Sequence, residues 1–255
     1  MKKILLIGVA VLVALVVLAG VLAITFLNSL VKKGVETAGP IVTKVELRLA
    51  SADISILSGK GTLRGLFIGN PTGYKTASAI EVGEATLALK PSSLLSDKIV
   101  VRQVNVVAPE ITFEGSLKGS NLSKILENIQ AFTASEQAAK SGDKGKAKKL
   151  QVDDFAVTDG KIHLSATLLG GKALTVPLPD IHLAGLGQGP EGVTPGELIE
   201  KVFKEVLEGT LKAVGHALAN VGKEAVETAK DVGKGAVKQA EKVGKGITDL
   251  FKKKK

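Results

Sequence analysis

Apolar and polar residues alternate with a period of two over most of the chain between residues 42 and 115. Val45, Leu47 and Leu49 alternate with three charged residues, which is typical of a strand with one buried and one solvated face. The same alternation predicts further strands near residues 51–58, 61–69, 79–90, 98–107, 109–115, 150–158, 160–169, 172–178 and 180–186. The hydrophobic pattern therefore predicts a fold that is mainly β.

Two of these strands change phase midway. One switches from even to odd apolar positions after Val82, and another switches from odd to even after Val101. A slip of one residue moves every later side chain to the other face of a sheet. A β-bulge near Gly83-Glu84 and another near Arg102-Gln103 would restore the apolar face. Because bulged strands coil, we expect a bent, strongly twisted antiparallel sheet.

Two short segments predict turns between strands. Asn70-Pro71-Thr72-Gly73 combines a proline with fixed φ and a glycine suited to positive φ, which is typical of a turn. Asp159-Gly160 lies between two apolar runs, and this dipeptide predicts a β-hairpin.

Later segments change to helical periodicity. Ser120-Asn121 begins a predicted helix over residues 121–138, whose apolar stripe we expect to pack on the sheet. Residues 139–149 are rich in Lys and Gly and predict a solvated linker. Thr194-Pro195-Gly196-Glu197 has the pattern of a capping box and begins a long amphipathic helix. The broad apolar stripe of that helix predicts packing on protein or on lipid.

The C-terminal region carries an 11-residue repeat. Val-Gly-Lys recurs at 221–223, 232–234 and 243–245, a period that keeps one stripe on one face of a nearly straight helix. The basic end predicts either a solvated tail or a contact with anionic lipid, because a basic amphipathic helix gains affinity from each Lys near such a surface. The residues of this predicted membrane contact are Ile247, Leu250, Phe251, Lys252, Lys253, Lys254 and Lys255.

The N-terminal segment is apolar. No charged residue occurs from Ile4 to Leu27, which exceeds the roughly 20 residues that a membrane-spanning helix needs. Small residues at Ala19 and Ala23 would suit a cleaved signal, but the apolar run continues past both. We therefore favour a retained, single-pass signal anchor, with the bulk of the chain outside the cytoplasm.

Composition and candidate chemistry argue against an enzyme. The net charge is +9, cysteine is absent, and aromatic residues make up 3% of the chain, which is poor material for stacking on bases. The histidines His163, His182 and His216 lie in different predicted elements and lack metal-ligand spacing. We expect no catalytic residues, no cofactor and no metal, and we interpret Asp153-Asp154 and Asp159 as residues of strand ends and turns.

A resemblance follows from the turns and strands together. The residues that carry it are Gly59, Gly61, Leu63, Gly65, Leu66, Ile68, Gly69, Asn70, Pro71, Gly73 and Tyr74, followed by the segments 93–101, 109–114, 119–122 and 150–166. Over about residues 1–187 the chain resembles a short member of the AsmA-like envelope proteins. The resemblance implies an inner-membrane anchor, a periplasmic β domain, and a role in lipid traffic or outer-membrane assembly. The β region is too short to bridge an envelope alone.

A second resemblance supports an alternative. The Asn-Pro turn in an anchored β domain is similar to the water-stress domain of late embryogenesis abundant proteins, which implies a stress-protective or scaffolding role. The leading prediction is a non-enzymatic, membrane-anchored protein of lipid binding and envelope maintenance, with membrane lipids and envelope proteins as partners and no nucleic acid. Its predicted parts are an anchor and linker over 1–40, an α+β, mainly β domain over 41–190, and a helical basic tail over 191–255.

Overall fold

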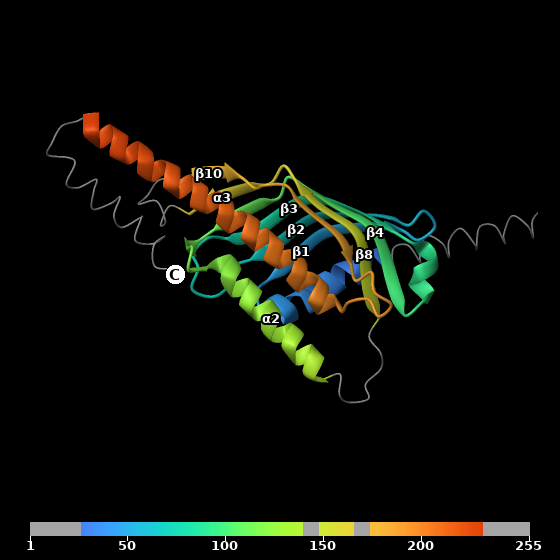
Figure 1. Cartoon of the computed structure of the whole chain (residues 1–255). Helices are drawn as coiled ribbons and strands as arrows, with labels where there is room; N and C mark the ends of the chain where they lie inside the picture. Colours follow the sequence, from blue (N-terminus) through green and yellow to red (C-terminus); the bar gives the residue numbers. More distant parts are fainter. Residues whose placement is uncertain (1–26, 140–147, 166–173, 232–255) are drawn as a thin grey trace, which may run out of the picture.

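The structure is a computed structural model that describes residues 27–139, 148–165 and 174–231, with side chains described as far as residue 221. The fold is α+β and mainly β. A curled sheet lies across two long helices that cover part of its inner face (Figure 1). The strands are β1 (Leu47–Ser55), β2 (Lys60–Gly69), β3 (Ser78–Leu89), β4 (Lys98–Val107), β5 (Glu110–Phe113), β8 (Lys149–Thr158), β9 (Lys161–Leu164), β10 (Leu174–Pro177) and β11 (Ile181–Leu186), and a separate hairpin of β6 (Gly115–Ser116) and β7 (Gly119–Ser120).

The sheet is mixed, so the prediction of an antiparallel sheet was wrong. β1, β2 and β3 form an antiparallel meander, and β4 and β5 pair with successive parts of β3. β8 then pairs with β4 in parallel, and β9 pairs with β5 in parallel. The physical reason is the crossover through α2 (Asn121–Ala139), since parallel neighbours need a long connection of this kind.

Asp159-Gly160 does not form the predicted hairpin. β8 and β9 do not pair with each other. They lie end to end, and the register of β8 against β4 continues unchanged in the register of β9 against β5. Asp159 takes a φ of 57°, which suits a kink within one long strand as well as a hairpin turn. Backbone bonds continue across the kink, from the Ala108 amide to the Thr158 carbonyl at 2.8 Å and from the Lys161 amide to the Pro109 carbonyl at 2.8 Å.

The residues that lie opposite Asp159 on the other strands form one line across the whole sheet. We call this line the crease. The registers place its members opposite one another from strand to strand. Three of them have left-handed backbone: Gly65 at φ 62°, Ala108 at φ 50° and Asp159 at φ 57°. The crease consists of Ala50, Gly65, Gly83, Ala108, Asp159 and Pro179.

The crease explains the first phase change in the sequence. The prediction of a bulge near Gly83-Glu84 was wrong, because the register between β2 and β3 is unbroken there. The left-handed residues turn the strands at this line, and the inner face passes from Val82 to Ala85 without an inserted residue. The second prediction is confirmed, since the register between β3 and β4 shifts so that Arg102 is the extra residue.

A helix over residues 27–43 runs beside the edge strand β1, where the sequence predicted a linker over residues 28–40. Its side chains bond to the β1 backbone. The Ile54 amide donates to Asn28 Oδ1 at 2.9 Å, the Leu49 amide donates to Glu36 Oε1 at 3.1 Å, and Lys32 donates to the Ala50 carbonyl at 3.1 Å. This N-terminal helix therefore satisfies edge groups that would otherwise be open to pairing.

Both later helices begin where the sequence predicts. Ser120 caps α2 through its hydroxyl, which accepts a hydrogen bond from the Ser123 amide at 3.1 Å. The predicted capping box begins α3 (Pro195–Asp231): the Glu197 amide donates to Thr194 Oγ1 at 3.1 Å, and the Thr194 amide donates to Glu197 Oε2 at 2.8 Å. Through Phe203, Leu207 and Val214, α3 packs on protein.

The predicted membrane segments lie mostly outside the described residues. This applies to the anchor over Ile4–Leu27, except for Leu27, and to the repeat beyond residue 231. Most of the predicted solvated linker over residues 139–149 also lies outside the described residues. None of the helices in the described part of the chain has the length and apolar character to cross a membrane.

Candidate functional site

The crease divides the inner face of the sheet into two halves. Helices cover the centre of one of them. We call it the covered half; it contains β5, β9, β10 and the adjoining parts of β1, β2 and β3. Its central side chains are fully buried: Ile111 is 1% exposed, Phe113 0% and Ile162 0%. From α2, Ile125 and Ile129 pack against them at 0% exposure. The centre of this half is therefore an ordinary hydrophobic core, with partly exposed apolar residues only at its margins, among them Leu66 and Leu174.

The second half has the same apolar face with less covering it. We call it the open half; it contains β4, β8, β11 and the adjoining parts of β1, β2 and β3. Helix α3 covers β8 and β11, where Val157 is 3% exposed. The inner side chains of β2, β3 and β4 stay partly exposed instead. We call this set the inner patch: Leu63, Ala85, Leu87, Leu89, Ile99, Val101, Val104 and Val106.

The registers show that the inner patch is continuous. Leu87 lies between Gly61 of β2 and Val104 of β4, and Ala85 lies between Leu63 and Val106. The Leu87 side chain packs over Gly61, because a Cβ at this glycine would lie only 2.8 Å from Leu87 Cδ1. The patch therefore spans three neighbouring strands without a charged side chain.

The outer face of the same strands is polar. Arg64 pairs with Glu84 at 3.2 Å, and Gln103 donates to Asp154 Oδ2 at 3.5 Å. Asp154 also pairs with His182 across β8 and β11. The open half is thus one-sided, with solvated groups outside and partly exposed aliphatic groups inside.

A polar network closes the far end of the covered half. Asn121, at 0% exposure, donates to Asn70 Oδ1 at 2.7 Å and to the Thr112 carbonyl at 2.8 Å, and it accepts from the Glu114 amide at 3.1 Å. Asn70 in turn donates to the Thr76 carbonyl at 2.7 Å. The Asn-Pro turn therefore fastens the β2–β3 connection to the start of α2, which is a structural role.

Glu114 completes this network as a carboxylate. It accepts from the Thr76 amide at 2.8 Å, the Thr76 hydroxyl at 2.7 Å and the Lys75 amide at 2.9 Å. Burial by itself would raise the pKa of Glu114, but the hydrogen bonds from Thr76 and Lys75 outweigh it and lower the pKa. The ionised carboxylate of Glu114 therefore holds the loop that contains Lys75 and Thr76 in place. Among the described residues, no side chain faces it as a partner in a reaction.

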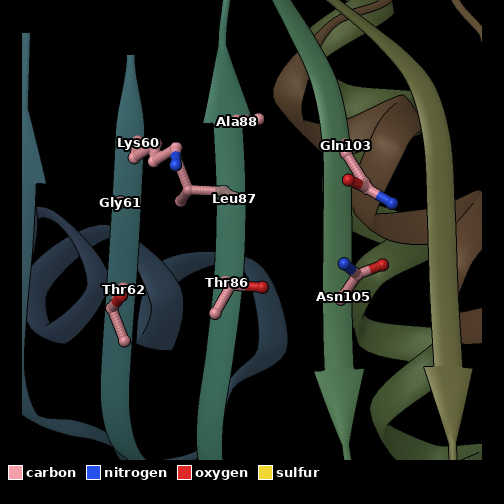
Figure 2. A pocket seen from close by; sticks show the side chains of 8 residues that line it. All are labelled: Lys60, Gly61, Thr62, Thr86, Leu87, Ala88, Gln103 and Asn105. Carbon is pink, nitrogen blue, oxygen red and sulfur yellow. The ribbon is translucent and has the colours of Figure 1, made fainter. Parts of the chain in front are cut away.

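A shallow depression of about 220 Å³ lies on the outer face of the open half, over β2, β3 and β4 (Figure 2). Hydroxyl, amide and methyl groups surround it, and Lys60 is the one ionisable side chain among the described residues that line it. A nucleophile with an adjacent base, which acyl or phosphoryl transfer would need, is not among these residues. Its lining is Lys60, Gly61, Thr62, Thr86, Leu87, Ala88, Gln103 and Asn105.

Two further hollows lie along the helices. One of about 470 Å³ is bordered by Leu117, Leu211 and His216, and one of about 430 Å³ lies between α2 and α3 near Thr133 and Glu200. Both are open surface depressions between packed elements.

The three candidate histidines lie apart from one another, and the interpretation of Asp153-Asp154 as residues of a strand end was wrong, because both lie in the middle of β8. His163 lies on the polar face of β9, with its Nδ1 3.0 Å from Thr175 Oγ1. His182 pairs with Asp154 on the outer face, and Asp159 is a member of the crease. His216 is exposed on α3. Within the described ranges, no group of three or more His, Asp or Glu side chains is placed to hold a metal ion.

The predicted membrane contact from Ile247 to Lys255 lies outside the described residues, so it stays a prediction. The inner patch was missed as a site. Its residues are visible in the sequence as apolar strand positions, but alternation alone does not say which of them a helix covers. Comparisons with protein-family models and with curated proteins found no match to this chain.

Proposed function

We propose that this protein is a non-enzymatic, membrane-anchored lipid-binding protein that holds an acyl chain against the inner patch. The observation that carries the proposal is the difference between the two halves of one sheet. Both have an apolar inner face, yet the inner patch, from Leu63 to Val106, remains partly exposed while the centre of the covered half, at Ile111, Phe113 and Ile162, is fully buried.

The chemistry of the patch fits an aliphatic ligand. Each CH₂ group that leaves water gains roughly 0.8 kcal/mol, so a chain lying on Leu87, Leu89 and Val104 would be bound without any specific polar contact. The patch consists of Leu, Ile, Val and Ala side chains, and aliphatic surfaces of this kind accept acyl chains of varying length. Partly exposed apolar area next to a closed core is typical of binding sites.

The sequence supports the same cellular setting. The uncharged segment Ile4–Leu27 predicts an N-terminal anchor, and the strand and turn motifs resemble AsmA-like envelope proteins. We therefore propose an inner-membrane protein whose sheet lies in the periplasm and serves lipid traffic or envelope maintenance. The basic end, Ile247 to Lys255, would add a second contact with anionic lipid.

Photo-crosslinking of the full chain tests the proposal. The protein is embedded in vesicles with a phospholipid that carries a diazirine on its acyl chain, and labelled residues are located by mass spectrometry. We expect labelling on Leu87, Val104 and neighbouring members of the inner patch. The segment Ile4–Leu27 would be labelled in any case and serves as an internal positive control.

Matched variants separate the two faces. Leu87→Trp and Val104→Trp fill the inner face and should reduce labelling of β2–β4 several-fold. Thr86→Trp and Asn105→Trp lie on the outer face of the same strands and should leave labelling unchanged. Equal circular dichroism spectra show that each variant is folded. The proposal fails if labelling is confined to the anchor, or if the outer variants reduce labelling as much as the inner ones.

A further inference from the structure

Two leucines are exposed to solvent at the end of the sheet that lies nearest the start of the N-terminal helix. The turn between β1 and β2 exposes Leu57 to 97%, and the 3-10 helix η1 (Pro91–Leu95) exposes Leu95 to 97%. Ile56 in the same turn is 44% exposed. Single exposed apolar residues are common on protein surfaces, but two fully exposed leucines at adjacent loop tips are a distinct feature.

The two loops and the helix start form one surface, which we call the loop end. The Leu89 amide donates to the Gly59 carbonyl at 2.5 Å, which joins the β1–β2 turn to the segment that enters η1. The Ile54 amide donates to Asn28 Oδ1 at 2.9 Å, which places the first turn of the N-terminal helix beside them. Leu30, 56% exposed, lies in that first part of the helix. In Figure 1 the β1–β2 turn and η1 both lie at the right-hand end of the sheet.

Several lysines lie in or next to the loops that carry these leucines. Lys148 donates to the Leu94 carbonyl at 2.6 Å, and Lys98 donates to the Gly189 carbonyl at 3.2 Å. Within the described residues of the loop end and of the adjoining segments, which are the end of β1, the starts of β4 and β8 and the loop over 187–192, the cationic side chains are Lys60, Lys90, Lys98, Lys148 and Lys149, and the acidic ones are Asp53, Asp97 and Glu191. The excess is positive, as an anionic surface requires.

The opposite end of the sheet differs. Its loops, residues 70–77 and 114–120, carry Lys75 and Lys118 against Glu114, and Tyr74 and Leu117 are only partly exposed. Both ends are basic, but of the two only the loop end has fully exposed leucines among the described residues, and it is also the end where the chain leaves the predicted anchor Ile4–Leu27.

We propose that the loop end docks onto the surface of an anionic lipid bilayer, with Leu57 and Leu95 inserted among the lipids and the lysines against their headgroups. The anchor keeps the loop end within reach of the bilayer, and insertion removes two leucine side chains from water. Docking would also place the open half, and with it the inner patch, next to the membrane. The proposal rests on exposure and charge at the loops and does not depend on lipid binding by the inner patch.

The absence of cysteine from the chain makes a direct test available. Ser58→Cys and Ser92→Cys each introduce one labelling site beside an intact leucine, and Thr72→Cys places the same label at the opposite end. Each full-length protein carries an environment-sensitive fluorophore in vesicles of phosphatidylcholine with phosphatidylglycerol and a spin-labelled quencher lipid. We expect quenching at least two-fold stronger at positions 58 and 92 than at position 72, and weaker quenching in vesicles of phosphatidylcholine alone.

A second variant tests the leucines themselves. Leu57→Asp with Leu95→Asp should at least halve the quenching at positions 58 and 92. Ile41→Asp is the matched control, because Ile41 is 52% exposed at the far end of the N-terminal helix, and it should change nothing. Quenching at 58 and 92 that is no greater than at 72, or that survives both aspartates, overturns the proposal.

Two further outcomes have clear meanings. A label at position 58 that is shielded from aqueous iodide but not quenched by lipid would show that protein covers the loop end, which also overturns docking on lipid. Loss of docking with continued acyl-chain labelling of Leu87 would leave the proposed function standing. Docking without any labelling of Leu87 would overturn lipid binding by the inner patch and support the docking proposal alone.

Discussion

The two halves of the sheet share β1, β2 and β3 and differ in what packs on them. In the covered half, α2 and α3 reduce the exposure of Phe113 and Ile162 to 0%. In the open half α3 packs mainly on β8 and β11, and the inner patch between β2 and β4 stays partly exposed. The comparison shows that an apolar strand face becomes a core or a binding surface according to the length and placement of the helices across it.

The crease is the boundary of this comparison. Left-handed residues at Gly65, Ala108 and Asp159 turn the sheet at one line, so helices that pack flat on the covered half diverge from the open half. Four predictions test the covered half and the crease, from the largest expected effect to the smallest. Each uses urea unfolding of the full chain in mild detergent, followed by circular dichroism.

The largest difference is expected in the core. Phe113→Ala removes a fully buried ring and should lower the free energy of unfolding by about 3–5 kcal/mol. Leu87→Ala in the inner patch, where the side chain is partly exposed, should cost only about 1–2 kcal/mol. Equal costs at the two positions would show that the inner patch is packed as tightly as the core.

The polar network gives the second comparison. Asn121→Ala leaves the Glu114 amide, the Thr112 carbonyl and Asn70 Oδ1 without their partner, and buried polar groups left unpaired make this cost about 2–4 kcal/mol. Asn105→Ala on the outer face of the open half should stay within about 0.5 kcal/mol. A mild effect at Asn121 would mean that water replaces the lost amide.

The crease itself can be tested at two glycines that face each other. Gly65 has a φ of 62°, and an added Cβ would lie 2.7 Å from the Ala50 Cβ, so Gly65→Ala should cost about 1–3 kcal/mol. Gly83 has no atom within 4 Å of an added Cβ, and Gly83→Ala should be nearly neutral. A tolerated alanine at position 65 would show that the crease does not depend on left-handed backbone there.

The smallest expected effect is on the pH dependence. The pKa of Glu114 is lower in the folded protein than in the unfolded chain, so its stabilising contribution is present above the unfolded pKa, near 4.5. It is lost as the pH falls through the folded pKa. Glu114→Gln should therefore be less stable than the wild-type protein at neutral pH and should lose less stability between neutral and acidic pH. Parallel pH curves for the two proteins would contradict this.

Much of the fold follows from local sequence. The alternation places β2, β3 and β4 close to their observed bounds, the Asn-Pro segment turns with Gly73 at φ 101°, and the capping box begins α3 as predicted. The extra residue at Arg102 is also confirmed. These features depend on residues within a few positions of each other, so the sequence carries their physical cause directly.

Pairing between distant strands was not predictable in the same way. Asp159-Gly160 suits a hairpin and an in-strand kink equally, because both need positive φ, and only the parallel alignment of β8–β9 with β4–β5 selects the kink. The N-terminal helix was likewise missed. It is held beside β1, a strand that follows it in the chain, by hydrogen bonds that Asn28 and Glu36 accept and that Lys32 donates.

The sequence by itself determined which residues are apolar on each strand, where the turns and helix caps lie, and that an uncharged segment precedes the sheet. Only the tertiary structure decided which apolar residues are sealed and which stay accessible. Side-chain burial depends on packing between elements far apart in the chain: α2 and α3 close the covered half, the crease turns the strands away, and Leu87 and Val104 remain partly exposed. The proposed lipid-binding surface is therefore a consequence of tertiary packing.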